Sequence, residues 1–318
     1  MKILITGGSG FIGTNLVSFF IKSHDVLNID INEPKIKQHL QYWVNIDIND
    51  YDRLNIAVQD FNPDYIIHLA ARTDLKGSSV DDYSSNVKGV ENIVNVAKQI
   101  KSLKKIIITS SMLVCHVGYI PKDDFDYSAT TFYGKSKVET EKITWNAHLT
   151  CDWAIIRPTS IWGPWFDVPY KSFFEMVKSH TYFHIGNKGC SKTYGYIGNS
   201  VYQIERILMS DTTDICNKVF YIGDTPAINI KEWANQISSL LGSKVYTIPW
   251  FLIKCAAYLG DILKYIGIPF PMTSFRLKNM TTDNIVNLEK TYKIAPNPPY
   301  ERIEAIKETL KWMERTEQ

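Results

Sequence analysis

The sequence predicts an α/β protein with a doubly wound parallel sheet and a smaller C-terminal lobe. Short apolar runs alternate with segments of helical spacing over roughly the first half of the chain. The first of these runs ends in a cluster of glycines, and the alternation stops near residue 165. Alternation of this kind is typical of a parallel sheet with helices on both faces.

The apolar runs have the length and composition of buried parallel strands, and they cover residues 2–6, 25–30, 42–46, 64–70, 105–110 and 153–157. The segments between them place apolar residues at helical spacing, over residues 11–22, 51–59, 86–101 and 133–149. Repeats of strand, helix and strand form parallel sheets through right-handed crossovers.

Prolines and aromatic residues cluster where the alternation stops, in RPTSIWGPWFDVPY, and the rest mixes helices and loops. This change predicts a second lobe over the carboxyl edge of the sheet, where ligands of such sheets bind. We expect a dinucleotide-binding domain over residues 1–165 plus about 196–225. The substrate-binding lobe would then comprise about 166–195 and 226–318.

The composition is that of a globular protein of 318 residues, with 45% apolar and 21% charged residues. The formal charge of +2 includes no long basic or acidic run, so nucleic acid is not expected as a partner. The five cysteines are widely spaced and the histidines lack metal-ligand spacing. We expect reduced thiols, a cytoplasmic protein without a signal peptide, and no metal site.

The most apolar segment covers residues 249–270, but Lys254, Asp261 and Lys264 interrupt it. A spanning helix needs about 20 consecutive apolar residues, so no membrane span is expected. Two interpretations remain for this segment. It is an amphipathic core or lid helix, or it is a helix that lies on a membrane surface.

The glycine cluster has the pattern G-x-G-x-x-G, with Gly8, Gly10 and Gly13 between the first strand and the first helix. In that context the pattern predicts a dinucleotide site. Gly8 would permit a tight turn, Gly10 would let the backbone approach a pyrophosphate, and Gly13 would let the helix lie close to the sheet. The helix N-terminus would attract the phosphates.

Asp30 ends the second strand at about the 20-residue distance expected for a ribose-binding acid. Its carboxylate can accept hydrogen bonds from two ribose hydroxyls and would repel a 2′-phosphate, so NAD is expected rather than NADP. Lys35 and Lys37 lie near enough in sequence to leave NADP open.

Tyr133 and Lys137 are four residues apart on an expected helix and therefore share one face. A free tyrosine has a pKa of about 10, and a nearby ammonium would lower it. Tyr133 could then exchange a proton with a hydroxyl while a hydride moves to or from a nicotinamide. Ser111 follows the fifth strand and is expected to hold the substrate oxygen beside Tyr133.

A series of motifs runs through the first part of the chain: TGGSGFIG (6–13), Asp30, DI (47–48), HLAA (68–71), NVKG (86–89), TSSMLV (109–114), YGKSK (133–137) and RPTSIWGP (157–164). In these motifs the chain resembles extended short-chain dehydrogenase/reductases of the NAD-dependent epimerase/dehydratase family. The resemblance covers about residues 1–225. It implies a Rossmann fold, NAD as cofactor, a nucleotide sugar as substrate, and a homodimer formed through helices 86–101 and 133–149.

The resemblance also implies roles for individual residues. Asp47 and Ile48 would flank the adenine, and Asn86 would lie near the nicotinamide end. The full set of implied cofactor contacts is Gly7, Gly10, Phe11, Ile12, Asp30, Asp47, Ile48, Leu69, Ala70, Ala71, Asn86, Tyr133, Lys137 and Pro158.

Two departures from the family pattern narrow the chemistry. Family dehydratases carry Asp and Glu after the catalytic hydroxyl, where this chain has Met112 and Leu113. Neither side chain can move a proton, so dehydration is disfavoured. Epimerase-reductases of the family carry a cysteine at the second position, which Leu113 excludes. Hydride chemistry remains: a hydroxyl is oxidised and re-reduced by the same NAD, or a ketone is reduced once. The resemblance favours the first reaction, epimerisation of a nucleotide-activated sugar at C4 through a 4-keto intermediate.

The substrate side differs more from the family pattern. Ser160 replaces an Asn that contacts the nucleotide sugar, and Lys192 aligns with an Arg that binds the diphosphate, which lysine holds only as a point charge. YGYIGN (194–199) and residues 249–270 also resemble hydroxysteroid dehydrogenases. The alternative is therefore a one-way reductase or dehydrogenase of a 4-keto nucleotide sugar or of a sterol- or flavonol-like alcohol.

Three smaller expectations complete the sequence-based picture. A non-catalytic dinucleotide-binding regulator is disfavoured, because Tyr133 and Lys137 are both present. Cys115 and His116 are adjacent on an extended chain, so their side chains should point in opposite directions and not pair. His68 lies in a buried strand and should be structural.

Overall fold

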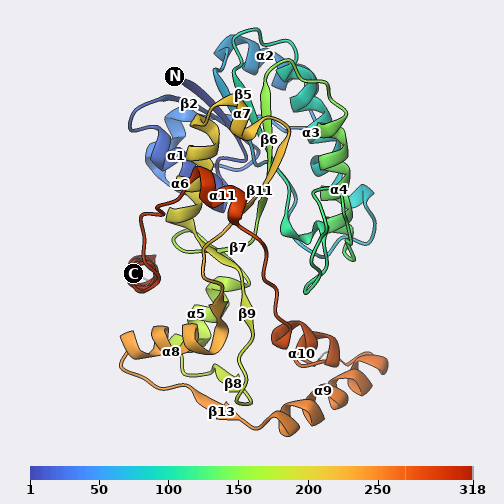
Figure 1. Cartoon of the computed structure of the whole chain (residues 1–318), viewed down its shortest axis with the longest axis vertical. Helices are drawn as coiled ribbons and strands as arrows, with labels where there is room; N and C mark the ends of the chain where they lie inside the picture. The colour runs from blue at the N-terminus through green and yellow to red at the C-terminus, as the bar shows by residue number, and fades with distance from the viewer. Residues whose placement is uncertain (269, 317–318) are drawn as a thin grey trace.

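The computed structural model describes residues 1–268 and 270–316. Among these residues, a seven-stranded parallel sheet occupies one half of the molecule (Figure 1), in the order β11-β6-β5-β4-β1-β2-β3. Its strands are β1 (Lys2–Thr6), β2 (Asp25–Asp30), β3 (Trp43–Asn45), β4 (Tyr65–His68), β5 (Lys105–Thr109), β6 (Asp152–Pro158) and β11 (Lys218–Ile222). The order reverses between β1 and β4, as in doubly wound dinucleotide-binding sheets, so the predicted fold class is confirmed.

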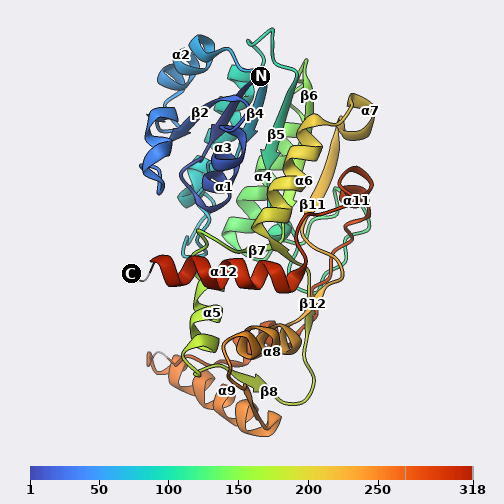
Figure 2. The same ribbon diagram turned by 90° about the vertical axis from the view of Figure 1, so that its left-hand side faces the viewer.

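Helices cover both faces of the sheet (Figures 1 and 2). One face carries α1 (Phe11–Phe20) and α6 (Ile197–Met209), and the other carries α2 (Tyr51–Phe61), α3 (Ser84–Ala97) and α4 (Phe132–Trp145). Alternate side chains of β1 enter two separate cores. Ile3 and Ile5 pack on the α1 side, whereas Leu4 packs on the α2 and α3 side. This burial on both faces explains why the strands are apolar at successive positions.

The predicted elements occur with shifts of a few residues at their ends. The expected strand at 64–70 is shorter, because Leu69 and Ala70 leave the sheet and line a cavity. The seventh strand, β11, was not predicted. It is the apolar run KVFYI, and it pairs with β6 in the register Phe220 to Ile156.

Most of the remaining elements form a second lobe beyond the carboxyl edge of the sheet (Figure 1). The lobe contains α5 (Tyr170–Lys178), β8 (Phe183–Ile185), α8 (Ile230–Leu240), β13 (Tyr246–Ile248), α9 (Trp250–Tyr265) and α10 (Ser274–Thr281). Short strands join the two halves: β7 (Ser160–Trp162), β9 (Ser191–Lys192), β10 (Tyr194–Tyr196) and β12 (Ile228–Asn229).

The last two helices pack against the sheet half. α11 (Glu289–Ile294) lies against α6 and β11, and α12 (Arg302–Thr316) crosses between the two halves (Figure 2). Ala305 and Ile306 of α12 enter the larger core. The short elements are α7 (Thr212–Ile215) and the 3₁₀ helices at Lys37–Tyr42, Asp81–Tyr83 and Met112–Val114. Within the described part of the chain, no helix has both the length and the apolar character needed to cross a membrane.

Candidate active site

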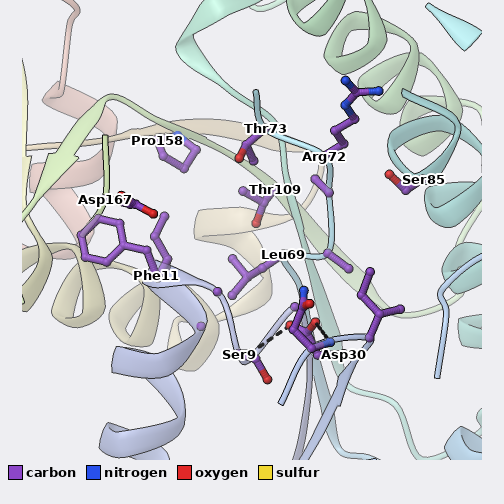
Figure 3. A pocket seen from close by; sticks show the side chains of 18 of the residues that line it. Ser9, Phe11, Asp30, Leu69, Arg72, Thr73, Ser85, Thr109, Pro158 and Asp167 are labelled. Atoms are coloured by element: carbon purple, nitrogen blue, oxygen red, sulfur yellow. Dashed lines mark hydrogen bonds between the residues drawn. The ribbon is translucent and has the colours of Figure 1, made fainter. Parts of the chain in front are cut away.

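A cavity of about 870 Å³ opens at the carboxyl edge of the sheet, next to the point where the strand order reverses (Figure 3). The loops after β1 to β6 and the start of α4 form its walls. The predicted cofactor residues that line it are Gly7, Gly10, Phe11, Ile12, Asp30, Asp47, Ile48, Leu69, Ala70, Ala71, Tyr133, Lys137 and Pro158. Sheets of this topology bind their ligands in this crevice.

The turn from β1 into α1 packs closely against the backbone of Ala70 and against the first residues of α1. Gly7 has a φ of 76°, a left-handed conformation that favours glycine. A Cβ added at Gly7 would lie 2.6 Å from the backbone nitrogen of Ala70, and one at Gly13 would collide with the carbonyl oxygen of Gly7. The helix therefore begins directly against the turn.

The other two glycines of the pattern have different surroundings. The tight turn expected at Gly8 occurs at Gly7, and a Cβ at Gly8 would collide with the side chain of Asn28 from β2. Gly10 is the N-cap of α1 and offers no side chain to cap the helix. The first N–H groups of α1 thus receive no side-chain acceptor from the cap position, which suits the binding of phosphate oxygens.

Asp30 extends from the end of β2 to the glycine turn. Its Oδ2 accepts a hydrogen bond of 3.0 Å from the backbone N–H of Ser9 (Figure 3), and its Oδ1 accepts one of 2.9 Å from Asn32. Lys35 also lines the cavity, but its Nζ points to the carbonyl oxygen of Trp165 at 3.4 Å. The carboxylate therefore carries the negative charge next to the turn, where it would repel a 2′-phosphate.

Asn86 differs from the other predicted cofactor residues because it is fully buried and does not line the cavity. Its Oδ1 accepts a hydrogen bond of 2.8 Å from the N–H of Arg72, and its Nδ2 donates to the carbonyl oxygen of Arg72 and to Ser136. In this structure Asn86 holds the loop after β4 against α4.

Ser111, Tyr133 and Lys137 meet at one wall of the cavity. Tyr133 and Lys137 lie one turn apart near the start of α4, and both are buried. A side-chain hydrogen bond joins Tyr133 to Ser111, which follows β5. Lys137 Nζ donates to the carbonyl oxygen of Thr109 at 2.9 Å. The end of β5 and the helix α4 thus position the three predicted catalytic side chains.

The pKa of Tyr133 corrects one expectation. Burial raises it to about 12, and the hydrogen bond to Ser111 offsets only part of that rise. The sequence predicts that Lys137 lowers this pKa, but in this structure the pKa is raised because burial removes the phenolate from water. Burial also lowers the pKa of Lys137 to about 8, while Glu141 acts in the opposite direction.

A buried ion pair lies behind these residues and was not predicted. Glu141, one turn beyond Lys137, forms two hydrogen bonds with Arg157 of β6, of 2.7 and 2.8 Å, and both side chains are fully buried. Ser110 and Tyr127 also donate to Glu141. The pair ties α4 to β5 and β6. The helical spacing of residues 133, 137 and 141 was the available signal.

Ser160 and Lys192, the predicted substrate residues, do not line the cavity. The hydroxyl of Ser160 accepts a hydrogen bond from Tyr170, which does line it. Lys192 Nζ donates to the carbonyl oxygen of Asn279 in α10 at 2.8 Å, and burial lowers its pKa. The structure therefore does not bring these two residues together with the Ser111, Tyr133 and Lys137 group in one cavity.

Asn284 links the loop after Ser111 to the second lobe, and it is buried. Its side chain accepts a 3.0 Å hydrogen bond from the N–H of Gly118. Its backbone N–H donates to Ser191, and its carbonyl oxygen accepts from Thr193. Three segments that are distant in sequence therefore meet at Asn284.

Cys115, His116 and His68 contact the rest of the protein and do not line the cavity. Cys115 is buried with a raised pKa, and His116 is exposed and packs on Tyr119 at 5.2 Å between ring centroids. His68 is buried, shares a 2.7 Å hydrogen bond with Thr6, and has its pKa lowered to about 3 by burial.

Sequence reasoning missed several residues of the cavity wall, among them Arg72, Thr73, Asp167 and Tyr170 (Figure 3 labels the first three). Arg72 is held by Asp74 through a hydrogen bond of 2.7 Å. The first three lie in loops and Tyr170 begins α5, and no local pattern predicts the course of these segments.

Comparison with known proteins relates the whole chain to one group of enzymes. The sequence model of the NAD dependent epimerase/dehydratase family matches residues 3–187. An N-acetyl-alpha-D-glucosaminyl-diphospho-ditrans,octacis-undecaprenol 4-epimerase of Escherichia coli O157:H7 is 25% identical over 98% of this chain and 95% of its own length. A 3 beta-hydroxysteroid dehydrogenase/Delta 5-->4-isomerase of Mycobacterium tuberculosis is 30% identical over 76% of this chain and 70% of its own.

Solved structures agree with this sheet and lobe arrangement. The UDP-glucose 4-epimerase of Thermotoga maritima, determined with UDP-glucose, has a TM-score of 0.77 and 20% identity, and the match covers 100% of both chains. The UDP-glucuronic acid 4-epimerase of Bacillus cereus, determined with UDP-glucuronic acid and NAD, has a TM-score of 0.77 and 18% identity, over 99% of this chain and 100% of that one. At these identities the likeness describes the fold.

Proposed function

The chain belongs to the NAD-dependent epimerase/dehydratase family, and from this we propose that it is an epimerase of a nucleotide-activated sugar that acts at C4 through a transient 4-keto intermediate. The observation that carries the proposal is the convergence of Ser111, Tyr133 and Lys137 on the cavity that begins at the glycine turn. Met112 and Leu113 follow Ser111 and cannot transfer a proton. Dehydration is therefore disfavoured, and hydride transfer is the chemistry that remains.

The residues of the cavity fit NAD. The close approach of backbone at Gly7 leaves no room for a side chain, and Gly10 begins α1 without a side-chain cap. We propose that this turn and helix end hold the pyrophosphate, and that Asp30 holds the adenine ribose. NAD supplies a hydride acceptor in the first half of the reaction and a hydride donor in the second.

The protein's own groups move the proton. In the first half, Tyr133 takes the proton of the sugar hydroxyl while Ser111 donates a hydrogen bond to the same oxygen. Tyr133 must be a phenolate to accept this proton, and Lys137, with a pKa of about 8, is mostly charged at neutral pH and stabilises that phenolate. In the second half, Tyr133 returns the proton to the keto oxygen. Its raised pKa makes the phenolate a stronger base for the first half and the phenol a weaker acid for this return.

We propose that the second lobe binds the sugar and its diphosphate, through residues 166–195 and 226–318. Lys192 donates one of its three N–H bonds to Asn279, which leaves two for a phosphate oxygen. Ser160 would act together with Tyr170, which lines the cavity. We also propose a homodimer through α3 and α4, and a reducing, cytoplasmic location in keeping with five free thiols.

The first experiment is an incubation of the purified protein with a panel of nucleotide sugars and no added cofactor. Separation coupled to mass detection should show a new peak of unchanged mass, because an epimerase returns its hydride to the sugar. The Tyr133→Phe variant should show no such peak. If no sugar of the panel gives a peak with the wild-type protein, the epimerase proposal is wrong.

A second function is supported by the mycobacterial hydroxysteroid dehydrogenase relative and by the apolar character of α9. It is a one-way dehydrogenase or reductase of a sterol- or flavonol-like alcohol or of a 4-keto nucleotide sugar. Such an enzyme would change NADH in proportion to product, and absorbance at the nicotinamide band would follow it. An epimerase would cause no net change.

A further inference from the structure

Helix α9 is apolar on two opposite sides. Ile253, Ala257 and Gly260 face inward and are buried with Leu277 of α10. The opposite side, which we call the outer face of α9, exposes seven apolar side chains: Phe251, Leu252, Tyr258, Leu259, Ile262, Tyr265 and Ile266. A helix at a protein surface usually places polar residues there.

The exposure of the outer face is large. Phe251 is 63% exposed, Ile262 is 62% exposed and Tyr265 is 92% exposed. Phe251, Tyr258, Ile262 and Tyr265 follow one another at spacings of seven, four and three residues, so they lie on one side of the helix and form a stripe along it. Figures 1 and 2 place α9 at the end of the molecule farthest from the sheet. A contiguous exposed apolar stripe of this kind is typical of a surface that binds another protein or a membrane.

The segment that contains α9 and α10 has a net positive charge. Residues 241–280 contain five cationic side chains and a single carboxylate, that of Asp261, so this segment carries +4 while the whole chain carries +2. Asp261 accepts a hydrogen bond of 3.1 Å from the N–H of Ser274, at the start of α10. Lys254 and Lys264 lie on α9 itself, and Arg276 and Lys278 lie on α10.

We propose that the outer face of α9 docks on an anionic lipid bilayer, with the helix lying in the plane of the headgroups. Apolar and aromatic side chains would enter the boundary of the acyl chains, and lysines at the edge of the stripe would reach the phosphates. A second copy of this chain fits less well. A symmetric contact would bring Lys254, which lies beside Tyr258, of both copies to one interface, and the positive charge of residues 241–280 would oppose it.

The test is flotation of the purified full-length protein with lipid vesicles, without substrate. Vesicles of phosphatidylcholine with 30% phosphatidylglycerol should carry the protein upward, and vesicles of phosphatidylcholine alone should carry less of it. High salt should weaken the binding, because it screens the headgroup charge.

Two pairs of variants locate the contact. Ile262→Asp should lower the bound fraction about tenfold or more, because it places a charge in the middle of the stripe. Ile56→Asp is the matched control, since Ile56 is 61% exposed but lies on α2. Lys254→Glu combined with Lys264→Glu should also weaken binding to the anionic vesicles. The control pair Lys22→Glu and Lys101→Glu, at exposed sites of the sheet half, should not.

Several outcomes would overturn the proposal. Wild-type protein that floats with neither kind of vesicle contradicts it, as does equal flotation of the Ile262→Asp and Ile56→Asp variants. Light scattering that shows a dimer broken by Ile262→Asp and kept by Ile56→Asp would assign the face to a second copy instead. The proposal does not depend on the epimerase assignment, because flotation is measured without substrate and does not require turnover.

Discussion

The sheet half and the α9 end of the molecule use apolar residues in opposite ways. Ile3, Leu4 and Ile5 of β1 are completely buried, each in one of two cores that helices close from outside. Phe251 and Tyr265 of α9 are mostly exposed. The apolar residues of the sheet half therefore stabilise the fold by packing within the chain. The exposed apolar residues of α9 would be buried only by contact with another molecule or a membrane. We propose that catalysis takes place in the first region and that the second positions the protein on a membrane.

The largest effect expected in the sheet half comes from Tyr133→Phe. The phenyl ring fills the same buried space but cannot exchange a proton, so activity should fall by about 10²- to 10⁴-fold. Turnover of the nucleotide sugar identified in the panel measures it, and the thermal midpoint of unfolding serves as the control for folding. Activity within a few-fold of wild type would remove Tyr133 from the mechanism.

The next largest effect concerns stability and the buried pair. Glu141→Gln should lower the free energy of unfolding by about 3–5 kcal/mol, because it leaves Arg157 charged and incompletely paired in the interior. Glu139→Gln is the matched control on the same helix. Glu139 is paired with Lys142 at the surface, so its change should have little effect. Denaturant unfolding compares the two, and equal midpoints would contradict the role given to the pair.

Two glycines of the turn should affect different properties, one the stability of the fold and the other the binding of NAD. Gly13→Ala should cost about 1–3 kcal/mol of stability, since its Cβ would collide with the carbonyl oxygen of Gly7. Gly10→Ala should fold normally, because its Cβ would lie 3.3 Å from that oxygen, but it should bind NAD more weakly. Unfolding curves and NAD titrations measure the two effects. Equal NAD affinity of Gly10→Ala and wild type would argue against the pyrophosphate site at this turn.

The pH dependence of activity sharpens the role of Lys137. Activity should decline as pH rises through about 8, where Lys137 loses its proton. Glu141 raises the pKa of Lys137, so Glu141→Gln should move this decline to lower pH. Rates from pH 6 to 10, at a temperature where the variant is folded, measure the shift. A decline at unchanged pH would mean that another group controls it.

The smallest effect is expected at the outer face of α9. Tyr265→Ser should change the free energy of unfolding by less than about 0.5 kcal/mol, because Tyr265 is 92% exposed. Ile253→Ala, on the inner side of the same helix, should cost about 2–5 kcal/mol. Similar losses for both variants would show that the outer face is part of the protein's own core.

Much of the sheet half was predictable because its signals are local. The apolar runs end in glycine or polar residues, and Tyr133 and Lys137 are one helical turn apart. The Glu141 and Arg157 pair was not predicted, because it joins a helix to a strand across the interior. The raised pKa of Tyr133 depends on burial, which no short motif reports. For residues 249–270, the structure shows that Ile253, Ala257 and Gly260 face inward, which the periodicity alone did not show.

The contacts of Asn284 have a consequence for how specificity can change. Gly118, Ser191 and Thr193 all form hydrogen bonds with this one residue, so the loop after Ser111 is joined to the strand that contains Lys192. A substitution in the outer lobe can therefore adjust the geometry beside Ser111 without altering the NAD half. During evolution, substitutions in the outer lobe alone can change which substrate is bound while the reaction stays the same.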